Sequence, residues 1–471
     1  MALFLVENLV TGGARRAVPV RSPLLWILGV GAIVRLIFLF YMADLELRMD
    51  EVQYQEIAVN LTEGRGFALN GSLTSWRPPL YPFVLSVLYT LTGTTDPVVA
   101  QGFQAILSLL NGLLVYLLGR SLFGERAGLG ATLLFTFYPS FLFYNNHILT
   151  EVLFTFLLTL TGYCFLAYLQ TGRLPLLGAS GVALGLAVLT RDIVWPMAGV
   201  MALLIWDVTR PGLTRWSGHS VALLLPFLVV VTPWIIRNTL VQKTFTLIAT
   251  NGGPVFYAGN YDHTPPDRPW RSHALDSELK VRRLLPPGLT EGEQQKVAFR
   301  KGLDFIWNHP GLTLRRTLIK AANIWGLERE VVGVLLKGGY GRLGRAAIFS
   351  VTALIFGAYI LTLLAGLTGL CFVLAKYRQG MAFHLFFAAL VVFFTLAHAA
   401  ASGHPRYHIP LIPFFSLYAA HAWAIRHKIW EGRRSMAFKV AAVVAGLLFA
   451  VWGREIFLIE FERFFQELSR L

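Results

Sequence analysis

The chain has 471 residues, of which 55% are hydrophobic and 14% are charged, and its formal net charge is +15. A soluble protein carries about a quarter charged residues, so the composition excludes an ordinary soluble protein and indicates a polytopic membrane protein. Basic cytoplasmic loops account for such a positive charge, and no basic, aromatic-lined module indicates nucleic acid as a partner. Cys164 and Cys371 lie in apolar runs, which predicts neither a disulfide nor a metal site.

Apolar runs long enough to cross a membrane recur along the chain. The first, 24–43, is near the ~20 residues that span a bilayer, so we expect a membrane span and not a cleavable signal peptide. Later runs lie near 97–119, 127–144, 150–170, 174–190, 192–208, 218–236, 347–374, 382–401, 407–425 and 436–452. The run 80–93 is shorter and predicts a re-entrant or interfacial helix. The fold class predicted is therefore an all-α polytopic membrane protein with about eleven to twelve transmembrane helices and external juxtamembrane helices.

Basic residues indicate the orientation of these helices. With the N-terminus in the cytoplasm and 80–93 not crossing, alternate loops hold clusters of Lys and Arg, as the positive-inside rule requires. These loops contain Arg120 and Arg126, Arg173, Arg210 and Arg215, Lys376 and Arg378, and Arg426, Lys428, Arg433 and Arg434. If 80–93 crossed the membrane, every later basic loop would face outward, so the charges favour the count without that crossing.

The same pattern divides the chain into four segments. Residues 1–236 are predicted to form an N-terminal transmembrane catalytic module with an external loop at 44–96. Residues 237–346 form a large external loop that includes a predicted helix at 291–308. Residues 347–452 form the C-terminal transmembrane helices. Residues 453–471 alternate large apolar residues with Glu and Arg, which is typical of an amphipathic interfacial helix.

Unusual polar residues lie at those helix ends that the orientation places outside. Charged groups are costly near hydrocarbon and usually mark function there. Their position on one side indicates an enzyme that works at one membrane face, and not a pore. The set comprises Asp50, Glu51, Tyr54, Arg77, His147, Glu151, Arg191, Asp192, Arg237, His404, Arg406 and Tyr407.

The first members of this set follow the first predicted span. Asp50 and Glu51, with Tyr54 close behind, could act as a general base or bind a cationic group, and the alternative is a solvated turn. Arg77 precedes two prolines and the short run 80–93, and at headgroup level it could hold a phosphate with two hydrogen bonds. The alternative for Arg77 is an ordinary lipid-headgroup anchor.

The next members open the spans at 150–170 and 192–208. His147 and Glu151 are four residues apart, so on a helix they would share a face and could orient a sugar. The alternative is an interfacial helix cap formed by Thr150 and Glu151. Arg191 and the adjacent Asp192 lie in a very short external turn, where they could simply neutralise each other.

The last members flank the large loop and the final external turn. Arg237 ends the span before the large loop. His404, Arg406 and Tyr407 are predicted to form an anion site. A zinc site on His404 and His408 is disfavoured, because Pro405 breaks a helix there and no third ligand is near in sequence.

Taken in order, these motifs resemble those of the membrane-embedded GT-C glycosyltransferases of the protein mannosyltransferase-like group, which includes glycosyltransferase family 39 and the aminoarabinose lipid A transferase. The motifs are the acidic pair after the first span, Arg-Pro before a short helix, an acid opening a later helix, and Arg406-Tyr407-x-x-Pro410 near the end. The resemblance covers about residues 25–425.

The resemblance implies inverting transfer of a sugar from a polyprenyl-phosphate-linked donor at the outer membrane face. It implies that Asp50 is the essential acid with Glu51 as its companion, and that Arg77 is the cation near the donor. Glu151 and Arg191 take the places of an Asp and a Lys of the aminoarabinose transferase.

The residue set agrees with that chemistry. A phosphate leaves as a stable anion, so one base and several cations suffice, whereas a glycosidase needs a second carboxyl group as acid. Asp50 would deprotonate the acceptor, and Arg77, Arg191 and Arg406 would stabilise the departing phosphate. No cofactor is expected. A divalent cation would need Asp50, Glu51 and Glu151 as ligands and is disfavoured, because cations already surround the expected phosphate.

We therefore expect an integral-membrane inverting glycosyltransferase, in the bacterial inner membrane with a periplasmic active site. Its partners would be a polyprenyl-phosphate sugar, membrane lipids and an acceptor, with a lipid or glycan acceptor favoured over a protein. Two alternatives stay open. A secondary transporter would carry charges at the midplane and show internal repeats, and a polysaccharide ligase would use a diphosphate-linked donor.

Overall fold

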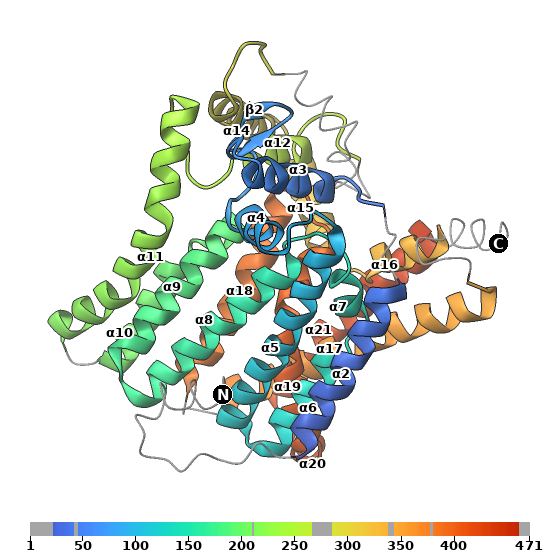
Figure 1. Cartoon of the computed structure of the whole chain (residues 1–471). Coiled ribbons are helices and arrows are strands. Elements are labelled where there is room, and N and C mark those ends of the chain that lie inside the picture. The colour runs from blue at the N-terminus through green and yellow to red at the C-terminus, as the bar shows by residue number, and fades with distance from the viewer. Residues whose placement is uncertain are drawn as a thin grey trace.

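The computed structural model describes residues 22–41, 46–209, 212–265, 285–337, 343–376 and 380–460. These residues are almost entirely helical (Figure 1). Within them, the β structure is one antiparallel pair of two-residue strands, β1 (Ala68–Leu69) and β2 (Ser72–Leu73). Asn70 and Gly71 form the turn with φ angles of 52° and 74°, which suits a two-residue hairpin. The predicted all-α class is confirmed.

Seven helices of the described chain are long and apolar enough to cross a membrane. They are α2 (Ser22–Tyr41), α5 (Pro97–Phe123), α8 (Glu151–Thr171), α11 (Leu213–Gln242), α17 (Arg345–Lys376), α18 (Met381–Ala400) and α21 (Met436–Arg454), which continues into η4 (Glu455–Glu460). Apolar but shorter helices are α4 (Leu80–Thr92), α9 (Leu174–Thr190) and α10 (Met197–Thr209), the last two joined by η1 (Asp192–Val194). The chain is thus a multi-pass membrane protein. The predicted number of eleven to twelve transmembrane helices is larger than seven because it includes apolar helices too short to span a membrane alone.

Prolines explain why two predicted spans are not continuous helices. The run 127–144 is divided into α6 (Glu125–Thr136) and α7 (Pro139–Tyr144), because Pro139 has no N–H to donate and Tyr138 before it is extended. The run 407–425 begins as the 3₁₀ helix η3 (Pro405–Leu411) and continues as α19 (Ile412–Ala424). Pro410 and Pro413 lie at that transition.

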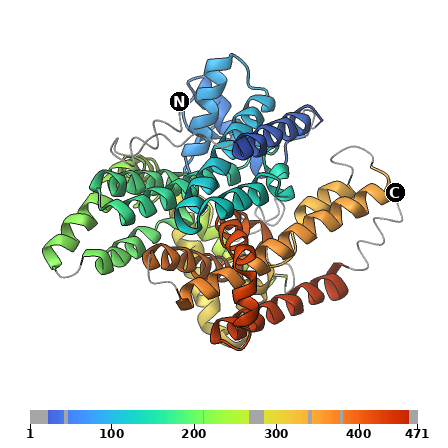
Figure 2. The same ribbon diagram turned by 90° about the horizontal axis from the view of Figure 1, so that it is seen from below.

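Close helix contacts hold the bundle together. α9 packs between α8 and α11, and α17 packs against α19. A Cβ added to Gly181 of α9 would lie 2.2 Å from the carbonyl oxygen of Leu223 in α11, so only glycine permits this approach. Viewed along the bundle from below, the helices of the N-terminal half and those of the C-terminal half lie on opposite sides (Figure 2).

Short helices cover one end of the bundle (Figure 1). They include α3 (Asp50–Thr62), α12 (Gly252–Gly259), α14 (Glu291–Asn308), α15 (Pro310–Ile324) and α16 (Arg329–Leu336). The predicted helix at 291–308 is therefore confirmed, and Thr290 and Glu293 form a capping box at its start. α20 (Arg426–Glu431) lies at the opposite end. Part of the predicted tail, 461–471, lies outside the described residues.

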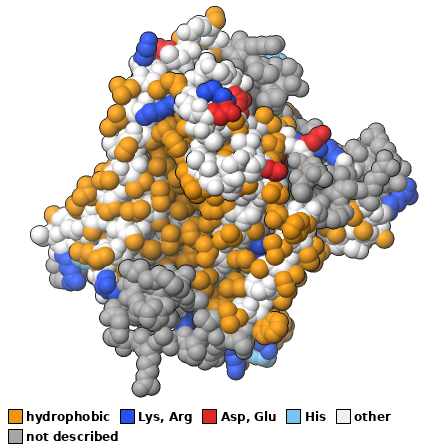
Figure 3. All heavy atoms as spheres, in the orientation of Figure 1, with side chains coloured by type: hydrophobic (Ala, Val, Ile, Leu, Met, Phe, Trp, Pro, Cys, Tyr) orange, Lys and Arg blue, Asp and Glu red, His pale blue; other side chains and the backbone are white. Residues whose placement is uncertain are grey.

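The surface matches this division of the molecule. Apolar side chains cover the flank of the helices, while most of the visible charged side chains lie toward the two ends (Figure 3). Large apolar residues such as Trp26, Phe40 and Leu225 are exposed there. In water such an area would be unfavourable, so it is the surface that faces lipid.

Candidate active site

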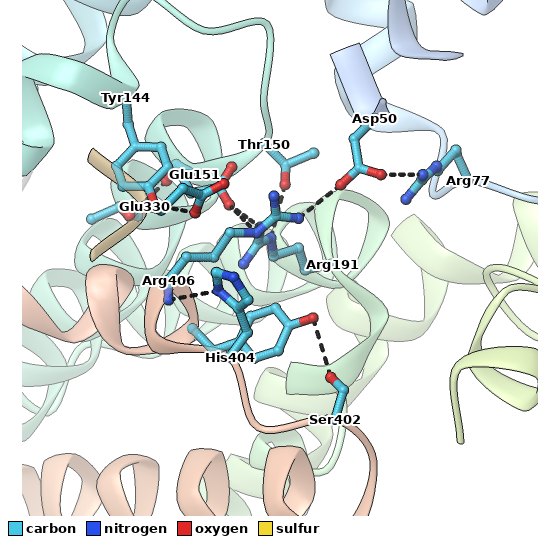
Figure 4. Close-up of polar contacts among 12 residues, drawn as sticks. Asp50, Arg77, Tyr144, Thr150, Glu151, Arg191, Glu330, Ser402, His404 and Arg406 are labelled. Carbon is cyan, nitrogen blue, oxygen red and sulfur yellow. Dashed lines mark hydrogen bonds and ion pairs between the residues drawn. The ribbon is translucent and has the colours of Figure 1, made fainter. Parts of the chain in front are cut away.

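Asp50 belongs to a group of charged side chains at the covered end of the bundle (Figure 4). It is the first residue of α3, and its carboxylate accepts hydrogen bonds from Arg77 Nη2 at 2.5 Å and from Arg406 Nη2 at 2.8 Å. Burial would raise the pKa of Asp50, but the two guanidinium groups outweigh burial and hold the pKa well below its usual range. Asp50 is therefore ionised in the resting site.

Arg77 is held in place by α3 as well. Its Nε donates to Gln53 Oε1 at 2.8 Å, and its guanidinium lies 5.3 Å from the centre of the Tyr54 ring. Tyr54 in turn packs edge-on against Tyr81 of α4. The predicted motif residues thus meet: Tyr54 supports Arg77 through its ring.

Arg406 joins the two halves of the site. Its Nη2 binds Asp50, and its Nε lies 3.2 Å from Glu151 Oε1. The backbone N–H of Arg406 donates to His404 Nδ1, so His404 caps η3 and fixes the backbone at Arg406. Asp50 and Arg406 are therefore in direct contact although they lie 356 positions apart in the chain.

Glu151 is the second carboxylate of the group and, unlike Asp50, is fully buried. Arg191 Nη2 donates to Glu151 Oε1 at 2.5 Å, and Arg191 Nε donates to Thr150 Oγ1 at 2.8 Å. Arg191 therefore pairs with α8 and not with Asp192, against the expectation of mutual neutralisation. As the capping alternative predicts, Thr150 is the N-cap residue of α8 and Glu151 begins the helix, but the Thr150 hydroxyl makes no side-chain cap bond.

His147 does not share a helical face with Glu151, because α8 begins only at Glu151. Its Nδ1 lies 3.0 Å from Glu51 Oε1, which also accepts the backbone N–H of Ile148 at 2.9 Å. Glu51 Oε2 accepts the N–H of Arg48 at 3.1 Å. Glu51 thus ties α3 to the segment before α8, and its part in catalysis stays a prediction.

Two further predicted residues lie outside this network. Arg237 donates to the carbonyl oxygens of Thr74 and Phe67, and its guanidinium lies 4.7 Å from the centre of the Trp234 ring. These contacts brace the segment that leads to Arg77. The Tyr407 ring stacks on His398 with the centroids 4.1 Å apart, at the edge of the group. Phosphate binding by Arg237 or Tyr407 stays a prediction.

The structure brings in residues that the sequence did not single out. Glu330 of α16 accepts a hydrogen bond from Tyr144 of α7 at 3.1 Å and faces Arg406 (Figure 4). Burial raises the pKa of Glu330, Arg406 opposes that effect, and Glu151 adds to it, with a net increase. No local signal in the long polar loop distinguishes Glu330 from the other acids there.

The geometry also bears on a bound metal. Both nitrogens of His408 already have partners, the carbonyl oxygen of Ile324 at 2.7 Å and Glu328 at 3.1 Å. Within the described ranges, no group of three or more His, Cys, Asp or Glu is placed to hold a metal ion. What the arrangement offers is a partly buried set of guanidinium donors suited to an anion, beside an ionised carboxylate suited to a base.

Part of the chain matches a known protein family. The family described as dolichyl-phosphate-mannose-protein mannosyltransferase matches residues 76–236, which include Arg77, Glu151 and Arg191. A protein of Aquifex aeolicus, described as uncharacterized, is 30% identical over 148 residues, which are 30% of this chain and 29% of that protein.

The fold is similar to that of larger membrane enzymes. The apo oligosaccharyltransferase of Archaeoglobus fulgidus superposes with a TM-score of 0.52 at 14% identity, covering 90% of this chain and 54% of that one. Apo ArnT of Cupriavidus metallidurans gives 0.43 at 13% identity, covering 84% and 76%. The chain thus spans about half the length of the oligosaccharyltransferase and less than a third of the Aquifex protein. Residues 76–236 are thus similar to the mannosyltransferase family, and the fold of the chain is similar to that of the oligosaccharyltransferase.

Proposed function

We propose that the chain transfers a sugar from a polyprenyl-phosphate-linked donor to a hydroxyl or amine acceptor, with inversion, at the extracytoplasmic face of the membrane. The observation that carries this proposal is the contact of Asp50 with both Arg77 and Arg406. The description of the matching family supports it, because that description names a sugar carried on dolichyl phosphate.

The donor phosphate would bind between the arginines. Guanidinium groups bind phosphate oxygens with paired, charge-assisted hydrogen bonds. Arg406 Nη1 makes no hydrogen bond to any described residue, so this donor is available to a ligand without breaking a contact. The Arg406 side chain is 20% exposed, which leaves it accessible from the site.

Donor binding would also activate the base. In the resting site Asp50 is a weak base, because Arg77 and Arg406 lower its pKa. When the phosphate shares those two guanidinium groups, their hold on Asp50 weakens and its pKa rises toward the usual range. The donor would thereby prepare the carboxylate that deprotonates the acceptor.

The transfer step then balances without an acid catalyst. The acceptor oxygen or nitrogen forms a bond to the anomeric carbon as the bond from that carbon to the phosphate oxygen breaks. The acceptor proton moves to Asp50, and the bonding electron pair stays on the phosphate, which becomes a monoester dianion. Arg77 and Arg406 stabilise the added charge in a site partly shielded from water.

Identification of lipids that copurify with the protein tests the proposal without knowledge of the acceptor. Wild type, Asp50→Asn and a control, Asp304→Asn on the exposed face of α14, would be compared by mass spectrometry. A polyprenyl-phosphate sugar enriched with Asp50→Asn alone is the expected result, because the variant binds the donor but does not consume it. Only ordinary phospholipids in all three, from cells shown to contain such donors, would contradict the proposal.

A further inference from the structure

The segment 324–330, which leads into α16, is fixed by contacts from several other elements. Its backbone is hydrogen-bonded at Ile324, Trp325 and Leu327. The side chains that make these bonds come from η3, α17, α21 and the start of η4. His408 contacts the carbonyl oxygen of Ile324 at 2.7 Å, Trp452 and Tyr359 donate to that of Trp325 at 2.8 and 2.9 Å, and Leu327 N–H donates to Glu455 at 2.6 Å. The position of α16 is therefore determined by the C-terminal helices.

Glu328 secures the same segment to the N-terminal half. Its buried carboxylate accepts hydrogen bonds from Tyr138 and Ser140, which flank the break between α6 and α7. His408 Nε2 lies 3.1 Å from the same carboxylate. Because both oxygens of Glu328 accept hydrogen bonds, its role is to anchor the segment. Glu330, two residues later, is thereby held in a defined position.

Glu330 lies on the far side of Arg406 from Asp50 (Figure 4). It receives one hydrogen bond, from Tyr144, and shares this side of Arg406 with Glu151. Glu151 Oε2 is buried without a hydrogen-bond partner among the described residues. Glu151 and Glu330 therefore lie on one side of a guanidinium group whose other side is bound to Asp50.

Around Arg406, three guanidinium groups, on Arg77, Arg191 and Arg406, face the three carboxylates of Asp50, Glu151 and Glu330. Glu51 lies beside this group and is paired with His147. A phosphodiester would add one negative charge to this partly buried group, and uncompensated charge away from water is costly. A carboxyl group that gains a proton would remove that cost.

We propose that Glu330 takes up a proton when the donor phosphate binds beside Arg406, so that the partly buried site accepts the anion without a change in net charge. This inference rests on the proposed function and assigns Glu330 as a further residue of the donor site. The charged and titratable groups that face it or its segment are Arg406, Glu151, Tyr144, His147, the pair Glu328 and His408, and the pair Arg329 and Glu455.

Among the acids of the site, Glu330 is suited to this part for a physical reason. The pKa of Glu330 is raised by burial and by Glu151, whereas the pKa of Asp50 is lowered by its two arginines. An anion placed next to Glu330 would raise its pKa further, so binding and protonation favour each other. The affinity for the anion must then fall as the pH rises through the pKa of Glu330 in the free protein.

Calorimetry on the full chain in lipid nanodiscs would test this inference. The probe is a short prenyl methyl phosphodiester, whose single charge does not titrate between about pH 5 and pH 8. Its binding is measured in buffers of different ionisation enthalpy, which reports the protons taken up. Wild type is compared with Glu330→Gln, which keeps the shape of the side chain, and with Glu431→Gln in α20 at the opposite end.

Wild type and Glu431→Gln should take up protons on binding. If binding raises the pKa of Glu330 by one unit, their affinity should fall about tenfold between a pH below the pKa of the free protein and a pH above that of the complex. Glu330→Gln should take up none, bind with an affinity that does not depend on pH, and bind more tightly than wild type at the alkaline end. Equal uptake in wild type and Glu330→Gln, or none in wild type, would overturn the inference. No binding to any of the three proteins would instead overturn the proposed function, and this inference with it.

Discussion

The arginines of the site are shared between carboxylates in the resting protein. Arg406 contacts Asp50 and Glu151 through different nitrogens, and Arg191 contacts Glu151 and Thr150. Such sharing keeps the guanidinium groups ordered at the place where a phosphate would bind, so little side-chain freedom is lost on binding. In the proposed mechanism, the same contacts would hold Asp50 in its ionised form until the donor binds.

Arg406→Lys tests whether the fork of donors on this residue matters, since lysine keeps the charge but cannot bind Asp50, Glu151 and a phosphate at once. Hydrogen bonds to charged groups contribute ~1.5–3 kcal/mol each. Affinity for the prenyl methyl phosphodiester should therefore fall about tenfold to a hundredfold. Arg426→Lys at the opposite end is the control, and equal affinities of the two variants would show that charge alone suffices.

Residues at the ends of apolar runs could be found from the sequence, and others could not. Asp50, Arg77, Glu151, Arg191 and Arg406 were expected on one side, and the structure brings them together. Glu330 was missed, because its place depends on contacts of the segment 324–330 with helices far away in the chain. Such tertiary contacts leave no periodic or local pattern in one sequence.

At the scale of elements, the helical breaks carry the main differences from expectation. A hydropathy pattern does not register a lost backbone donor, so the run 127–144 looked continuous although Pro139 divides it. The break has a structural consequence. Tyr138 and Ser140, which flank Pro139, both donate hydrogen bonds to Glu328.

Gly326→Ala tests the anchoring of the segment before α16. A Cβ at this position would lie 2.8 Å from Glu455 Oε1 and 3.0 Å from Oε2, closer than real contacts allow. Overpacking of this kind costs about 1–3 kcal/mol, so the midpoint of thermal unfolding in detergent should fall. Gly333→Ala in α16 is the matched control, because nothing lies within 4 Å of its added Cβ and alanine favours a helix. A midpoint for Gly326→Ala equal to that of Gly333→Ala would contradict this account of the anchor.

At the scale of the whole molecule, the basic loops and the charged site lie at opposite ends. α20 and the residues after it are basic, whereas α3, α12 and α14 cover the site end. The sequence predicted this division well, because charge in short loops reflects membrane orientation directly. The number of full spans was less predictable, since α9, α10 and the pair η3 and α19 are each shorter or irregular.

Labelling with a membrane-impermeant thiol reagent tests the orientation. In a background with Cys164 and Cys371 replaced by alanine, Asp304→Cys on α14 should be labelled from outside intact spheroplasts. Lys428→Cys on α20 should be labelled only after the membrane is opened, because the positive-inside rule predicts that its basic loop faces the cytoplasm. The reverse pattern would place the site in the cytoplasm and contradict the proposed face of transfer.

The central claim is that Asp50 is the base for transfer from a donor held by Arg77 and Arg406. The most direct test is single-turnover consumption of the copurified donor by wild type and Asp50→Asn, with binding of the phosphodiester measured on the same samples. Loss of general-base catalysis should slow turnover by about 10²–10⁴-fold while binding is retained or strengthened. Turnover by Asp50→Asn at the wild-type rate would show that Asp50 is not the base.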